Sequence, residues 1–85
     1  MDDLKSAVLN NIELSNEQIM EAFQMIGSAG NIVIIKNDGL RTENNYTVVI
    51  SSPTERFPSI RFDSNSLGMA FLNCLGRYFE AMPRS

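Results

Sequence analysis

With 85 residues and a formal net charge of −3, the chain is long enough for one hydrophobic core and too short for two, so we expect a single domain over residues 1–85. Hydrophobic residues make up 44% of the chain and charged residues 20%, which excludes the polar, aromatic-poor composition of a disordered protein. The sequence has no histidine and therefore lacks both the commonest general base and the commonest metal ligand.

Two helices are predicted in the first third of the chain. Residues 2–10 form a short helix whose apolar positions are spaced to face inward. A second helix begins after Ser15, because Ser15 and Gln18 have the spacing of a capping box. From Ile19 onward, apolar residues recur at i, i+3, i+4 and i+7, and Gly27 suits a left-handed stop at the end of the helix.

Three short segments then predict strands. Residues 32–35 form a continuous β-branched run, which we expect to be a strand covered on both faces. Residues 46–50 predict a second strand, joined to the first by a hairpin connection that contains the turn residues 37–39. Residues 59–62 alternate polar and apolar side chains as a third strand requires.

The last predicted helix follows the polar residues 63–66 and has to end before Pro83. Its apolar side chains occupy most of its circumference and leave one narrow polar stripe. Either the first two helices bury the side that the sheet leaves open, or a symmetric oligomer does so, and both explanations predict the same pattern. The residues predicted for an oligomer interface are Leu72, Gly76, Phe79 and Gly68.

The order of these segments predicts an α+β fold with two N-terminal helices, a three-stranded and mainly antiparallel sheet, and a C-terminal helix packed on the sheet. No apolar run of about eighteen residues occurs, and the first residues are acidic where a secretory leader is basic. The single cysteine, Cys74, is flanked by apolar residues and is expected to be a buried thiol, which suits a reducing compartment. We therefore expect a cytoplasmic protein.

The sequence gives little support for catalysis or for a metal site. Cys74 has no histidine partner and no electropositive setting that would activate it. Glu17 and Glu21 share one helix face, but no third ligand stands in register with them. We therefore expect a protein without a cofactor that binds another molecule and is not an enzyme.

A set of basic and small polar residues lies in the predicted strands and their loops. Arginine matches the geometry of phosphate or carboxylate, and hydroxyl and amide side chains add neutral hydrogen bonds, so the set is a candidate anion site. Alternatively, these cations are solvated and guard strand edges against pairing. The predicted ligand-binding residues are Lys36, Arg41, Arg56, Arg61, Thr42 and Asn45.

Two functions fit these observations. The first is a homo-oligomeric, non-enzymatic protein that sequesters an anionic, nucleotide-like ligand. The second is an inhibitor or adaptor that binds and blocks a partner protein, such as a nucleic-acid enzyme, through its acidic helices or an exposed apolar helix face. Acidic charge concentrated in residues 1–30 argues against direct binding of duplex nucleic acid. In size and in its acidic, histidine-free composition the chain resembles the small proteins with which phages interfere with bacterial machinery, which implies a counter-defence or regulatory role.

Overall fold

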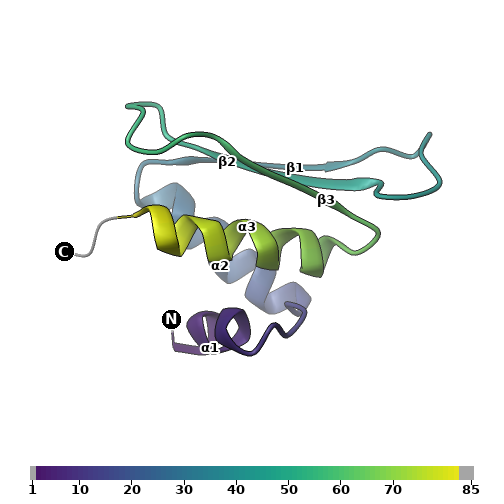
Figure 1. The fold of residues 1–85 in the computed structure, drawn as a ribbon, viewed down its shortest axis with the longest axis horizontal. Helices are drawn as coiled ribbons and strands as arrows, with labels where there is room; N and C mark the ends of the chain where they lie inside the picture. Colours follow the sequence, from purple (N-terminus) through teal and green to yellow (C-terminus); the bar gives the residue numbers. More distant parts are fainter. Residues whose placement is uncertain (1, 83–85) are drawn as a thin grey trace.

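The computed structural model describes residues 2–82 and has the predicted α+β fold (Figure 1). All three helices lie on one side of a three-stranded sheet (Figure 1). The strands pair in the order β1-β2-β3 and are antiparallel throughout. The elements are α1 (Asp2–Leu9), α2 (Asn16–Ser28), β1 (Ile32–Asn37), β2 (Tyr46–Ser51), β3 (Ile60–Ser64) and α3 (Leu67–Ala81).

Local hydrogen bonds determine where helices α2 and α3 begin. At the start of α2 the Ser15 hydroxyl accepts a hydrogen bond from the backbone N–H of Gln18, and the Gln18 side chain accepts one from the backbone N–H of Ser15, which confirms the capping box. The prediction of a left-handed stop at Gly27 is wrong, because α2 continues to Ser28 and the left-handed residue is Gly30, with φ of 89°. At the start of α3 the Ser66 hydroxyl accepts from the backbone N–H of Met69.

The core lies between the sheet and α3. Val48 and Ile50 point from β2 toward the helices and are 0% exposed. Phe71 and Leu75 of α3 are likewise 0% exposed, and α3 packs against both β2 and β3. Within residues 2–82 no helix combines the length and the apolar character that crossing a membrane requires.

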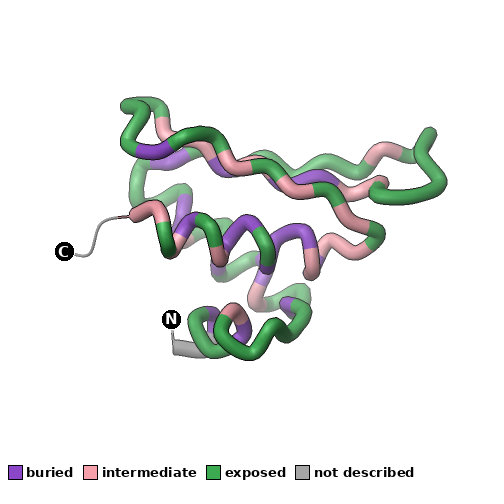
Figure 2. Tube along the Cα trace, in the orientation of Figure 1, coloured by how far each residue is buried: buried purple, intermediate pink, exposed green. Residues whose placement is uncertain are grey.

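A second layer, α1, covers the side of α3 that faces away from the sheet (Figures 1 and 2). Gly68 backs so closely onto the segment before α2 that a Cβ atom there would lie 2.5 Å from the carbonyl oxygen of Leu14. A Cβ atom on Gly76 would lie 3.5 Å from Cγ1 of Val8 in α1. Contacts within the chain therefore account for this apolar surface.

Those contacts bear on the predicted oligomer interface. Leu72 is only 3% exposed, and Phe79 is half-buried with the Lys5 ammonium 6.0 Å from its ring centroid. The structure thus favours burial of α3 by the chain's own helices, and oligomerisation through α3 stays a prediction. The interface residues that the chain itself contacts or buries are Leu72, Gly76, Phe79 and Gly68.

Strand β1 is less covered than its sequence predicts. Ile32 and Ile34 point away from the helices and are 46% and 52% exposed. Even Ile35, on the helix side, is 38% exposed, because α3 packs mainly against β2 and β3 while β1 is covered mainly by α2. The expectation that both faces of this strand are covered is wrong.

Candidate binding surface on the open face of the sheet

The strand register determines which side chains share the uncovered face of the sheet, called here the open face. Directly paired residues of neighbouring strands point to the same side. Ile34 pairs with Val49, and Val49 pairs with Arg61, so these three lie in one row across the sheet. A second row runs from Lys36 through Thr47 to Asp63, and Ile32 pairs with Ser51 in a third.

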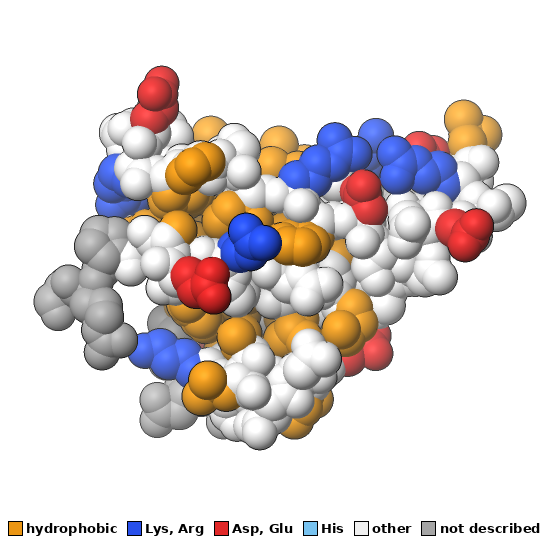
Figure 3. All heavy atoms as spheres, viewed as in Figure 1, with side chains coloured by type: hydrophobic (Ala, Val, Ile, Leu, Met, Phe, Trp, Pro, Cys, Tyr) orange, Lys and Arg blue, Asp and Glu red, His pale blue; other side chains and the backbone are white. Residues whose placement is uncertain are grey.

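The open face has an apolar end and a basic end. Ile32, Ile34 and half-buried Val49 form the apolar end. The basic end lies toward the loop between β1 and β2, where Lys36 and Arg61 on the strands are joined by Arg41 of the loop. Figure 3 shows Lys and Arg side chains gathered along this end of the sheet. The face therefore offers apolar contact beside positive charge.

Acidic neighbours partly neutralise the basic end. Asp63 accepts a hydrogen bond of 2.5 Å from the Thr47 hydroxyl, and one of its oxygens lies 3.6 Å from Nε of Arg61. The Thr47 hydrogen bond, helped by the charges of Arg61 and Arg41, holds the pKa of the Asp63 carboxyl below its usual range. Asp38 in turn lies 3.3 Å from Nε of Arg41.

The charge count at this end is accordingly low. Lys36, Arg41 and Arg61 contribute three positive charges, and Asp38, Glu43 and Asp63 contribute three negative ones, so the formal charges cancel. Within residues 2–82, Lys36 is the member of the trio for which no ion pair is formed. An anion arriving here would compete with carboxylates already in place.

The structure brings together only part of the predicted ligand site. Lys36, Arg41 and Arg61 share the basic end, and Thr42 is exposed on the same loop. Asn45 instead bridges the hairpin, since its amide donates to the side-chain oxygen of Asn37 at 3.0 Å. Arg56, the sixth predicted ligand-binding residue, does not lie at this end of the sheet.

Arg56 lies at the opposite end of the sheet, in the loop between β2 and β3. Its guanidinium donates to the side-chain oxygen of Asn31 at 2.9 Å. The Asn31 amide donates in turn to the buried hydroxyl of Tyr78 at 3.0 Å. Because β2 is six residues long, roughly 20 Å separates its two ends, so Arg56 ties a loop to the core and is not part of the basic end.

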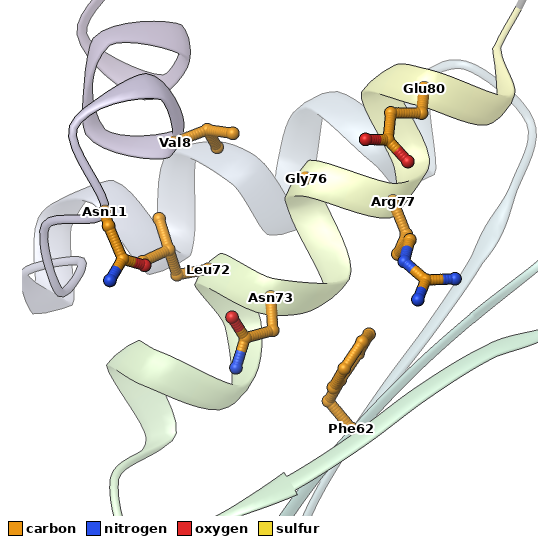
Figure 4. A pocket seen from close by; sticks show the side chains of 8 residues that line it. All are labelled: Val8, Asn11, Phe62, Leu72, Asn73, Gly76, Arg77 and Glu80. Carbon is orange, nitrogen blue, oxygen red and sulfur yellow. The ribbon is translucent and has the colours of Figure 1, made fainter.

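A shallow groove that the sequence analysis did not single out runs between α1, α3 and β3 (Figure 4). Its open volume is about 220 Å³, and the guanidinium of Arg77 lies 5.8 Å from the ring centroid of Phe62 at one side. The volume is below the roughly 300 Å³ at which ligand pockets begin. The polar stripe of α3, with Asn73, Arg77 and Glu80, borders this groove and was its only sequence signal.

The thiol of Cys74 is enclosed in the core. Its side chain is 0% exposed and donates to the backbone carbonyl of Val48 at 3.2 Å. Burial raises the pKa of Cys74 to about 12, so the nucleophilic thiolate is suppressed at neutral pH. Over residues 2–82, no cluster of three or more Cys, Asp or Glu side chains has the proximity to hold a metal ion.

Comparisons with known proteins assign no family. The chain matches no protein-family model, no curated protein and no solved structure. A function is therefore inferred from the residues and surfaces described above.

Proposed function

We propose that the protein is a non-catalytic inhibitor or adaptor that binds a partner protein through the open face of its sheet. The observation that carries this proposal is the uncovered apolar row of Ile34 and Val49, with Ile32 beside it. Single exposed apolar residues are ordinary on a protein surface, whereas a contiguous patch with a polar rim is typical of a docking site. Burying these side chains against a partner supplies the driving force.

The rim of the patch specifies the chemistry of the partner. Lys36 and Arg61 flank the apolar row on the strands that border it. Opposite charges at a rim orient two proteins and speed their encounter. The partner is therefore expected to present aliphatic side chains next to an aspartate or glutamate.

The absence of catalysis in this proposal follows from the available side chains. The chain has no imidazole, and its one thiol is buried and protonated at neutral pH. Binding by the open face requires neither group.

Peptide selection tests the proposal. The immobilised protein is screened against a displayed library of random peptides, and the selected peptides are measured by calorimetry. We expect aliphatic residues beside an acidic one, and at least a tenfold loss of affinity with Val49→Glu, which places a charge in the centre of the patch. Arg61→Glu is expected to weaken the binding of acidic peptides in particular.

Leu9→Glu is the matched control, because it adds the same charge as Val49→Glu. Leu9 is 84% exposed at the end of α1, which lies away from the sheet, so its replacement adds a charge outside both the apolar row and the basic end. Affinity should be unchanged. Selected peptides that bind wild type, Val49→Glu and Arg61→Glu equally well would place binding on a different surface and contradict the proposal.

Sequestration of a nucleotide-like anion is the second candidate, favoured by the meeting of Lys36, Arg41 and Arg61 at one end of the sheet. Its weakness is the pairing of both arginines with carboxylates. A ligand that binds only the native state raises the melting temperature with concentration. A shift with nucleotides that Lys36→Ala and Arg61→Ala abolish would support this candidate, and no shift with any nucleotide would exclude it for those ligands.

A further inference from the structure

The two edges of the sheet are protected to different degrees. On β3 the outward-pointing side chains are Arg61 and Asp63, and charges of this kind discourage pairing with another strand. On β1 the exposed side chains are Ile32, Ile34 and Ile35, and the strand's one charged residue is Lys36 near its end. A long apolar edge without protection is a site for β-pairing.

Along this edge, backbone N–H and C=O groups of β1 point away from β2. The N–H of Asp38 donates to the carbonyl of Asn45 at 2.7 Å, and this pair continues the β1–β2 register. In an antiparallel ladder hydrogen-bonded pairs alternate with non-bonded pairs, so residues 34 and 36 also bond to β2. The N–H and C=O groups of Val33 and Ile35 therefore point outward to the free edge.

We propose that β1 pairs antiparallel with β1 of a second copy about a twofold axis at Ile34, so that two three-stranded sheets become one sheet of six strands. In this register Val33 of each copy lies opposite Ile35 of the other, and their outward backbone groups form the hydrogen bonds. Ile34 meets its own counterpart across the axis on the open face. Every side chain keeps its side of the sheet, because residues of equal parity are paired.

The charges on β1 favour this register, and they favour β1 of a second copy as the strand that pairs with the free edge. With the axis at Ile34, Lys36 lies opposite Ile32, and the two lysines are four residues or roughly 13 Å apart along the strands, beyond the screening length of about 10 Å. Moving the axis to Ile35 would place the lysines on a diagonal only about 7 Å apart. A strand that meets itself with Val33, Ile34 and Ile35 matched to apolar residues and no like charges opposed is self-complementary.

Helix α2 adds apolar surface to the same half of the molecule. It packs beneath β1, and its Met20 and Phe23 are 54% and 38% exposed.

Edge pairing leaves the open face of both sheets uncovered, so the dimer is independent of the proposed partner binding. Each can fail without the other.

Light scattering after size-exclusion chromatography, from micromolar to millimolar protein, tests the dimer. We expect twice the monomer mass for wild type and the monomer mass for Ile34→Lys and for Ile34→Glu, since each places like charges face to face on the axis. Mixing these two variants opposes a lysine and a glutamate there. The mixture should recover the dimer, which a general loss of folding would not allow.

Circular dichroism establishes that both variants are folded, and Leu40→Lys, with its added charge away from the edge, should remain dimeric. A wild-type protein that is monomeric throughout this range overturns the proposal. So does a dimer whose mass Ile34→Lys and Ile34→Glu leave unchanged, because association would then use another surface, such as the side of α3. Failure of the folded variants to associate on mixing places the axis elsewhere and contradicts the stated register.

Discussion

Helix α3 and strand β1 are both rich in apolar residues, yet they are enclosed to opposite degrees. In α3, Phe71, Cys74 and Leu75 are 0% exposed, with the sheet on one side and α1 on the other. In β1, Ile32, Ile34 and Ile35 are all exposed. The helix whose pattern suggested an outside partner is covered by its own chain, and the strand expected inside has a free edge.

The difference teaches that apolar pattern and enclosure are separate properties. A periodic pattern identifies the side chains that gain from leaving water, but it does not identify the surface that covers them. For α3 that surface is α1, which lies some sixty residues earlier in the chain and meets it only through tertiary folding. For β1 a fourth helix on the open face would be required, whereas all three helices of residues 2–82 lie on the other side of the sheet.

The largest expected effect is on thiol reactivity. In an Ile32→Cys variant the introduced thiol on β1 should react with iodoacetamide at the rate of a free cysteine, whereas Cys74 should react only through unfolding. A stability of about 5 kcal/mol leaves roughly one molecule in several thousand unfolded, so labelling of Cys74 should be slower by three orders of magnitude or more. Intact-mass spectra over time, with a reductant present, measure both rates.

The control is the same experiment in urea, where both thiols should react at similar rates. Equal labelling of the two thiols under native conditions would show that α3 opens readily, and the contrast between helix and strand would be lost.

Truncation of buried side chains should give the next largest effect. Leu75→Ala removes a fully enclosed side chain and is expected to lower the free energy of unfolding by about 2–5 kcal/mol. Ile32→Thr keeps a β-branched side chain on an exposed site and should cost less than about 1 kcal/mol. Urea unfolding at low protein concentration measures both, and similar losses would contradict the difference in enclosure.

Much of the fold could be predicted because local signals and global packing agree. The Ser15 capping box, the inward alternation of β2 and the polar residues before α3 all have their causes within a few neighbouring residues. The left-handed stop of α2 was predicted three residues too early, because Gly30 and not Gly27 adopts the left-handed conformation. The strand order could not be predicted from the sequence, because neighbouring segments can pair in more than one way.

The candidate site could be predicted only in part, because the contacts between its residues depend on how separate segments pair in the fold. Lys36 and Arg41 lie at the same hairpin, as the turn residues indicate, and Arg61 joins them because β3 pairs with β2. Arg56 was misplaced because its loop lies at the other end of the strands, and no local pattern reveals its bond to Asn31. The acids beside the arginines were visible in the sequence, but their pairing depends on distances that only the fold defines.

The smallest expected effect compares two glycines within α3 and tests how tightly the helix is enclosed. Gly68→Ala places a methyl group 2.5 Å from the backbone oxygen of Leu14, which no side-chain rotation can relieve, and it should destabilise the protein by about 1–3 kcal/mol. Gly76→Ala meets only Val8 at 3.5 Å, an ordinary contact, and it gains the helix propensity of alanine, so it should stabilise by about 0.5–1 kcal/mol. Thermal and urea unfolding of the two variants should therefore shift in opposite directions. If Gly68→Ala were also stabilising, the segment before α2 would not press on α3 as described, and the helix would be as open on that side as β1 is at its edge.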